Sequence, residues 1–348
     1  MFGGERDNER ADAPSIIEAP DSLKRNYKYV LLYIGRGLNV VGSHDGLRWD
    51  PASATRIAAM HSDTSNSIVY DEARKEFVLY CRAKHIYHDT GDGILTGGEP
   101  RRIARMTSPD LWQEWKSRPQ NIMIPDERDA ESALTAFYGI SVKIYGGIYW
   151  GFVQSFRWNT EMESELAFSR DGIDFERLPH RPRFVEPGRN GEWDHGMMAV
   201  APWVEVGDEW WLYYGAADGP HAIPKGPNGP IWRVGCIGLA KVRREGFISM
   251  RGPEHGGVIA TRQILWPGGD LLVNADASSG ELKVRVTDEN RKEIPGFGYD
   301  DAVVFRGNGT REKISWKSHS LAALKGRIVR LDFYLRKADI YTFCASPE

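Results

Sequence analysis

Short runs of β-branched and aromatic residues alternate along the chain with turns rich in Gly, Asp, Asn and Pro. Helical periodicity is nearly absent, so the pattern predicts an all-β protein. The clearest predicted strands are KYVLLYIG (28–35), NSIVYD (66–71), EFVLYCR (76–82), ISVKIYGG (140–147), IYWGFVQSF (148–156) and EWWLYYGA (209–216).

A turn motif recurs after these strands. SHDGLRW begins at Ser43, SPDLWQEW at Ser108, SRDGIDF at Ser169 and a degenerate copy, RREGFIS, at Arg243. The intervals are 65 (108 − 43), 61 (169 − 108) and 74 (243 − 169) residues. A four-stranded blade takes roughly 40–50 residues plus loops, so this period predicts a β-propeller.

The motif itself predicts scaffold and not chemistry. The Asp-Gly pair supplies a tight turn, and the aromatic residue that follows is expected to pack between neighbouring blades. The aspartates of the motif are therefore expected to be structural, namely Asp45, Asp110 and Asp171.

Beyond about residue 252 the pattern becomes a clean alternation with turn signals every 8–12 residues or so, which predicts a β-sandwich. The predicted domains are a propeller of the five-bladed type (1–252) and a sandwich (253–348). Four blade units are visible in the sequence. A ring more often has five or more, so we expect either that the N-terminal segment completes a blade with help from elsewhere or that the sequence as given lacks one.

Composition narrows the function. The 348 residues include 12 Trp, 14 Tyr and 13 Phe, and carbohydrate sites favour exposed aromatic faces. A net charge of −3 gives no reason to expect nucleic acid or a membrane as partner. The three cysteines are far apart, so neither a disulfide framework nor a metal site is predicted, and no cofactor is expected. No leader or membrane-spanning run is visible, which predicts a cytoplasmic protein unless a leader was removed.

Polar residues placed just before the innermost strands of a propeller converge at one mouth of its channel. That rule selects three carboxylates as candidate catalytic groups: Asp63, Glu131 (or its neighbour Asp129) and Asp194. Paired carboxylates are what glycosidic cleavage requires, because one protonates the leaving oxygen while another attacks the anomeric carbon or activates water. Turn capping by Asp63 and a solvated loop around 126–131 remain alternatives. Glu163 and Glu165 are expected on the exposed face of an edge strand.

The same rule selects His61, Asn66 and His195, with Tyr138 farther in and Trp193 alongside, as residues expected to bind the sugar by hydrogen bonds and stacking. Arg82, Arg102 and Arg105 end or begin strands in the same region. Two interpretations are open for them: they are structural, or they orient carboxylates or bind an acidic sugar. Arg82 is counted among the residues expected to bind the substrate.

Several longer segments add a family resemblance: DTSNSIVYDEARKEFVLYCR, LAFSRDGIDFERLPHRPRF, EWDHGMM, GDEWWLYYGAADGPH and IPGFGYDD. With them the chain resembles the five-bladed propeller glycoside hydrolases of families 32 and 43, and in particular the family 32 N-terminal-like group. The resemblance implies a glycosidase with a carbohydrate substrate. The family 32 motifs WMNDPNG, RDP and EC are absent as such, and Asp63 is the nearest analogue by position.

Three other functions stay open at this point. They are a carbohydrate-binding propeller without catalysis, a glycoside phosphorylase in which a basic pocket binds phosphate, and an assembly platform that forms homo-oligomers through an open blade edge.

Overall fold

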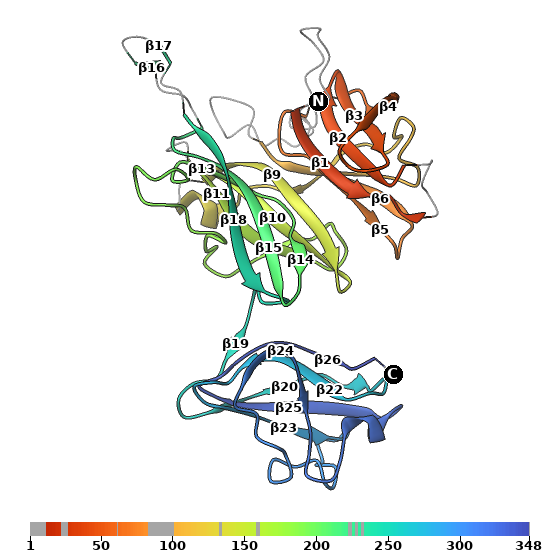
Figure 1. Cartoon of the computed structure of the whole chain (residues 1–348), viewed down its shortest axis with the longest axis vertical. Helices are drawn as coiled ribbons and strands as arrows, with labels where there is room; N and C mark the ends of the chain where they lie inside the picture. The colour runs from red at the N-terminus through yellow and green to blue at the C-terminus, as the bar shows by residue number, and fades with distance from the viewer. Residues whose placement is uncertain are drawn as a thin grey trace. The chain divides into compact units, whose positions relative to one another are not determined.

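The computed structural model describes residues 12–21, 27–60, 62–82, 101–131, 134–157, 161–221, 225–226, 229–230 and 233–347. Regular structure in these ranges is almost entirely β-strand, and their α-helix is the short α1 (Glu127–Glu131). The all-β prediction is confirmed (Figure 1). None of the described helices has the length and apolar character needed to cross a membrane.

The chain divides into two compact units, residues 1–203 with 212–240 and residues 204–211 with 241–348. The sequence places the division at 252/253, whereas the structure assigns 241–252 to the second unit. The Arg243 side chain gives a physical reason. Its guanidinium donates to Oδ1 of Asn274 and to Oδ1 of Asn308, both at 2.8 Å, and so ties this part of the chain to the C-terminal sheets.

Four groups of strands lie in residues 12–243, as expected for propeller blades. The first two are four-stranded sheets in sequence order. One contains β1 (Asp12–Glu18), β2 (Tyr29–Gly35), β3 (Gly37–Ser43) and β4 (Trp49–Ala58), and the other β5 (Ser67–Asp71), β6 (Glu76–Cys81), β7 (Ile103–Ser108) and β8 (Gln120–Met123). The N-terminal segment therefore supplies the first strand of a complete four-stranded sheet.

The third and fourth groups join into one larger sheet. The third contains β9 (Leu134–Tyr145), β10 (Ile148–Arg157), β11 (Met162–Ser169) and β12 (Glu176–Arg177). The fourth contains β13 (Met197–Val200), β15 (Glu209–Ala217) and β18 (Gly235–Arg243), with β14 (Val204–Val206) paired to the start of β15. A parallel pairing of Met162 with Met197 joins the two groups. The short strands β16 (Lys225–Gly226) and β17 (Gly229–Pro230) pair with each other.

The repeated turn motif is structural, as predicted. Oδ1 of Asp45 accepts hydrogen bonds from the backbone N–H groups of Leu47 (2.8 Å) and Arg48 (2.7 Å). Asp171 and Asp110 bind the backbone after them in the same way, Asp171 through two N–H groups and Asp110 through one. The bonds from Arg48 and Leu47 lower the pKa of Asp45, and equivalent bonds lower the pKa of Asp171.

Aromatic residues near these turns pack between sheets. Phe175, which follows the third turn, meets Tyr80 of the second sheet edge-on at a centroid distance of 5.7 Å. The Tyr80 hydroxyl also donates to the carbonyl oxygen of Gly172 in that turn at 3.0 Å. The third turn thus holds its own blade to the blade before it, which is the role that the sequence predicts for the motif aromatics.

The second and third sheets approach closely at Gly139 of β9. Gly139 has a φ of 138° and pairs with Ser65 just before β5. A Cβ at this position would lie 2.4 Å from the carbonyl oxygen of Ser65. The close approach therefore requires glycine.

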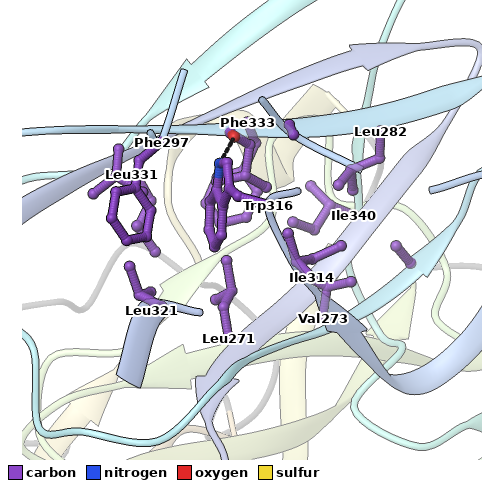
Figure 2. Packing of buried hydrophobic residues seen from close by; sticks show 14 of the residues in the cluster. Leu271, Val273, Leu282, Phe297, Ile314, Trp316, Leu321, Leu331, Phe333 and Ile340 are labelled. Carbon is purple, nitrogen blue, oxygen red and sulfur yellow. Dashed lines mark hydrogen bonds between the residues drawn. The ribbon is translucent and has the colours of Figure 1, made fainter. Parts of the chain in front are cut away.

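The second unit consists of two four-stranded sheets around one core. One contains β19 (Met250–Arg251), β26 (Asp339–Ala345), β22 (Leu271–Asp276) and β24 (Asn308–Ile314), and the other β20 (Gly257–Ala260), β25 (Ile328–Arg336), β21 (Ile264–Leu265) and β23 (Glu281–Thr287). Figure 2 shows Trp316 within this core, near Phe297 and Phe333. Its indole N–H donates to the carbonyl oxygen of Val284 at 2.9 Å, so the core carries a satisfied polar group.

Candidate functional site

The loop before β5 is held by its own side chains. The Ser62 hydroxyl donates to Oδ1 of Asn66 at 2.6 Å, and Nδ2 of Asn66 donates to the carbonyl oxygens of Ser62 (3.1 Å) and Thr64 (3.0 Å). Asn66 is buried, so the contacts of this predicted sugar-binding residue shape the loop. His61 lies outside the described residues.

Asp63 projects from this loop with 59% of its side chain exposed. Nη2 of Arg101 lies 3.0 Å from its Oδ2, and Nη1 of Arg82 lies 3.8 Å from the same oxygen. Nη1 of Arg101 also binds the backbone carbonyl of Asp63. Among the candidate carboxylates whose side chains are described, Asp63 is thus the exposed one, and two guanidinium groups flank it.

The guanidinium group of Arg101 also contacts a group of aromatic rings. Its Cζ lies 4.0 Å from the ring centroid of Tyr138, a cation–π geometry. Two further rings pack against Tyr138. Phe156 lies at a centroid distance of 4.8 Å, and His221 meets Tyr138 edge-on at 4.7 Å. Nη1 of Arg233 donates to the carbonyl oxygens of His221 (2.5 Å) and Pro220 (2.9 Å).

We refer to Asp63, Arg101, Tyr138, His221 and Arg233 as the mouth cluster. Its members come from the second, third and fourth groups of strands and lie up to 170 residues apart (233 − 63). Of the site residues predicted from the sequence, Asp63, Arg82 and Tyr138 come together here.

His221 is the titratable ring of the cluster. Burial lowers the pKa of His221 below its ordinary value of 6.5, and the positive charges of Arg101 and Arg233 lower it further, while Asp63 acts in the opposite direction. At neutral pH the ring is therefore an uncharged imidazole that can accept or donate a hydrogen bond.

A pocket of about 440 Å³ adjoins the cluster at Arg233. Its walls are largely apolar and come from β13, β15 and β18, with Gln154 of β10 at one side; they include Met197, Ala199, Gly215, Ala217 and Ile237. Gln154 links two groups of strands, because its Oε1 accepts from the Ser65 hydroxyl (3.0 Å) while its Nε2 donates to the carbonyl of Met198 (3.4 Å).

Asp194 lies in the loop before β13 and is buried. Its Oδ1 accepts from the backbone N–H of Gly188 (3.0 Å) and its Oδ2 from the Tyr214 hydroxyl (3.1 Å). Burial, and then this bond to Asp194, raise the pKa of Tyr214. Trp193 stacks on Tyr214 at 5.8 Å and is 42% exposed, and Nδ1 of His195 lies 2.9 Å from the carbonyl oxygen of Glu192. The contacts of Asp194 therefore hold this loop on β15.

Glu131 is the last residue of α1, three positions before β9, and its side chain lies outside the described part of the structure. Its neighbour Asp129 is 1% exposed. Arg177 lies 2.8 Å from Oδ2 of Asp129, and Arg181 contacts Oδ1. Asp129 is thus part of a buried ionic network and not of an exposed charged loop.

The expectation that Glu163 and Glu165 face solvent is wrong. They are 3% and 2% exposed, and Glu165 shares Arg177 with Asp129. Glu163 accepts from Arg157 (2.5 Å) and Arg183 (2.6 Å), whereas Glu165 accepts from Ser155 and Arg177. The reason is that β11 pairs on both sides, with β10 and β12, and so is not an edge strand.

The sequence reasoning missed Arg101, His221 and Arg233. It considered residues ahead of first strands, but the end of the antiparallel second strand lies at the same edge of a sheet, and His221 follows the end of β15 there. It also selected Arg102 and Arg105 over their neighbour Arg101. Arg105 instead pairs with Glu76 of β6 at 3.1 Å.

The described residues contain no group of three or more His, Cys, Asp or Glu side chains arranged to hold a metal ion.

No protein-family profile matches the chain, and no curated protein matches it. Among solved structures, an N-acetylgalactosamine deacetylase from F. plautii in complex with blood group B trisaccharide is 17% identical, with a TM-score of 0.45 over 66% of this chain and 71% of that chain. A thermostable family-43 glycoside hydrolase is 16% identical, with a TM-score of 0.45 over 69% and 74%. An α-L-arabinanase from Cellvibrio cellulosa complexed with arabinohexaose is 12% identical, with a TM-score of 0.42 over 67% and 71%.

The neighbours thus include proteins named as glycoside hydrolases. Because these TM-scores lie below 0.5, the likeness carries no argument, and the function has to be argued from the residues.

Proposed function

We propose that the chain is a glycoside hydrolase that acts at the mouth cluster. The observation that carries this proposal is the convergence of an exposed carboxylate, Asp63, with an aromatic ring, Tyr138, and a neutral imidazole, His221. Sugar sites commonly combine aromatic surface with a few convergent polar groups. Hydrolysis of a glycosidic bond adds the need for carboxylates.

In this proposal Glu131 is the general acid. Asp63 and Asp194 share the roles of base or nucleophile and of transition-state support. A separation of the acid and the base or nucleophile near 5 Å would give retention of configuration, and about 6.5–9.5 Å would give inversion. Tyr138, Arg82, Trp193 and His195, with His61 and Asn66, are assigned to sugar binding.

The test is a screen of wild type, Asp63→Asn and Glu131→Gln against aryl glycosides and oligosaccharides, with and without phosphate. We expect wild type to cleave a substrate without phosphate and each variant to lose about 10²–10⁴-fold in rate, the range of general acid–base catalysis. Asp174→Asn is the matched control, since Asp174 is an exposed aspartate in the third turn of the same unit. Full turnover by Asp63→Asn would refute the proposal, and dependence on phosphate would replace it by the phosphorylase function.

A second function, sugar binding without catalysis, is favoured by one observation. Both carboxylate oxygens of Asp194 accept hydrogen bonds inside the protein, from Gly188 and Tyr214. A carboxylate held in this way stabilises a loop and is poorly placed to react. Wild type that binds a glycan but cleaves nothing in the screen would support this second function.

A further inference from the structure

We propose that the mouth binds a carbohydrate that carries a carboxylate, a uronate, with Arg233 and Arg101 as the groups that recognise the anion. This inference rests on the proposed function only in taking the mouth as a sugar site, and it does not depend on cleavage. The argument comes from charge, from the partners of Arg233 and from the adjoining pocket.

Positive charge gathers at the mouth although the whole chain carries −3. Among the described residues, the guanidinium groups of Arg82 and Arg101 lie near Asp63, and the positive charges of Arg101 and Arg233 both act on His221. His221 adds no positive charge at neutral pH, because its pKa is lowered. An anionic ligand would interact favourably with these guanidinium groups in a partly buried place, where screening by salt is weaker than at an open surface.

The contacts of Arg233 give the strongest indication that the mouth binds an anion. In the described part of the chain its hydrogen bonds go to two backbone carbonyl oxygens, those of Pro220 and His221, and it has no carboxylate within salt-bridge distance. Every other arginine discussed at this mouth lies near Asp63. A half-buried guanidinium held by neutral carbonyls keeps its full charge and is fixed in position before a ligand arrives.

The pocket beside Arg233 fits a sugar ring. Its volume of about 440 Å³ lies in the range of roughly 300–1,000 Å³ that is typical of small-ligand sites. Gly215 in its wall is open, since a Cβ there would meet no atom within 4 Å. The small and apolar wall residues can contact the C–H face of a pyranose, while Gln154 and Arg233 offer polar groups at the side.

A carboxylate suits this site better than a neutral hydroxyl. Guanidinium and carboxylate groups match in geometry and form charge-assisted, often bidentate, hydrogen bonds. Inorganic phosphate carries the same kind of charge and would point to the phosphorylase function, so the experiment includes it as a separate ligand.

The test is calorimetric titration of the full chain with methyl β-D-glucuronide, methyl β-D-glucoside, a glucuronate-containing oligosaccharide and its neutral counterpart, and inorganic phosphate. We expect wild type to bind the glucuronate compounds at least about tenfold more tightly than their neutral counterparts, which corresponds to about 1.4 kcal/mol. Arg233→Gln should remove that preference. Arg170→Gln, which changes an exposed arginine in the same unit, should keep it.

Arg233→Lys separates a specific role from misfolding. It keeps the charge but loses the planar fork, so we expect an intermediate preference in a protein with an unchanged thermal transition. Equal binding of uronate and neutral sugars by wild type, or an unchanged preference in Arg233→Gln, would overturn the inference. The inference would also be overturned if phosphate bound and strengthened the binding of the neutral sugars while wild type showed no preference for uronate. The hydrolase proposal can fail in the cleavage screen while uronate binding persists, so the two failures are distinguishable.

Discussion

At the residue scale, a single carboxylate oxygen organises each of the repeated turns that begin at Ser43, Ser108 and Ser169. Oδ1 of Asp171 accepts from the N–H groups of Ile173 and Asp174, both at 2.9 Å. These donors would otherwise turn to water or remain unpaired, so the carboxylate stabilises a turn that the backbone alone specifies weakly.

Asp171→Ala should therefore lower the free energy of unfolding by about 1–2 kcal/mol, the usual effect of losing a capping side chain. Urea denaturation measures this change. Asp174→Ala removes an exposed carboxylate three residues further on and should stay within about 0.5 kcal/mol of wild type. Equal effects of the two substitutions would contradict a structural role for the motif aspartate.

The charge around His221 gives a second expectation at this scale. Folding favours its neutral form, so the stability contributed by His221 is complete above the ordinary pKa of 6.5 and is lost as the pH falls from there through the lower folded value. Arg233→Gln removes one of the positive neighbours and should raise the pKa of His221. An NMR titration of the imidazole protons reports it, with Arg170→Gln as the control that leaves it unchanged. A pKa that stays or falls in Arg233→Gln would show that Arg233 does not act on the ring.

At the scale of elements, the third sheet is tied by buried charge. Glu165 of β11 accepts from Ser155 of β10 and from Arg177 of β12, so one carboxylate joins three adjacent strands. Arg177 also reaches Asp129 of α1, which connects the helix before β9 to the same sheet. Buried ion pairs add little net stability over apolar packing, but removing one partner leaves the other uncompensated.

Glu165→Gln should therefore cost about 3–5 kcal/mol, because it leaves the buried Arg177 short of negative charge. Thermal and urea unfolding, followed by circular dichroism, measure this loss. Glu176→Gln alters an exposed glutamate on β12 and is the matched control, with an expected change below about 0.5 kcal/mol. If both variants unfold like wild type, Glu165 does not organise the sheet.

At the scale of the whole molecule, each unit contains its own buried clusters. Leu331 of β25 is fully buried in the core of the second unit, whereas Leu265 of β21 is 66% exposed. Leu331→Ala should destabilise that unit by about 2–5 kcal/mol, because it leaves a cavity among well-packed side chains. Hydrogen exchange read by mass spectrometry should show protection lost in residues 257–347 and retained in the first unit.

Leu265→Ala makes the same chemical change at the surface and should leave exchange unaltered. Loss of protection spread evenly over both units in Leu331→Ala would mean that they unfold as one.

Much of this fold could be predicted because its signals are local. The Asp-Gly turns and the strands between them depend on neighbours in sequence, and their spacing revealed the blades. The burial of Glu163 and Glu165 could not be read in the same way, since it depends on arginines supplied by two other strands and a distant loop. His221 and Arg233 were missed for a related reason, because the contact of His221 with Tyr138 arises only when separate sheets meet, and Arg233 is held by the His221 carbonyl.

Gly139 has a consequence for the width of the mouth. The backbone of β9 rests against the Ser65 carbonyl with no side chain between them, and Asp63 and Tyr138 stand directly beside this contact. The absence of a side chain at Gly139 therefore sets the distance between the segment that carries Asp63 and the strand that carries Tyr138. A methyl group at this position would push the second and third blades apart, and a ligand that contacts both blades would lose its contacts with one of them.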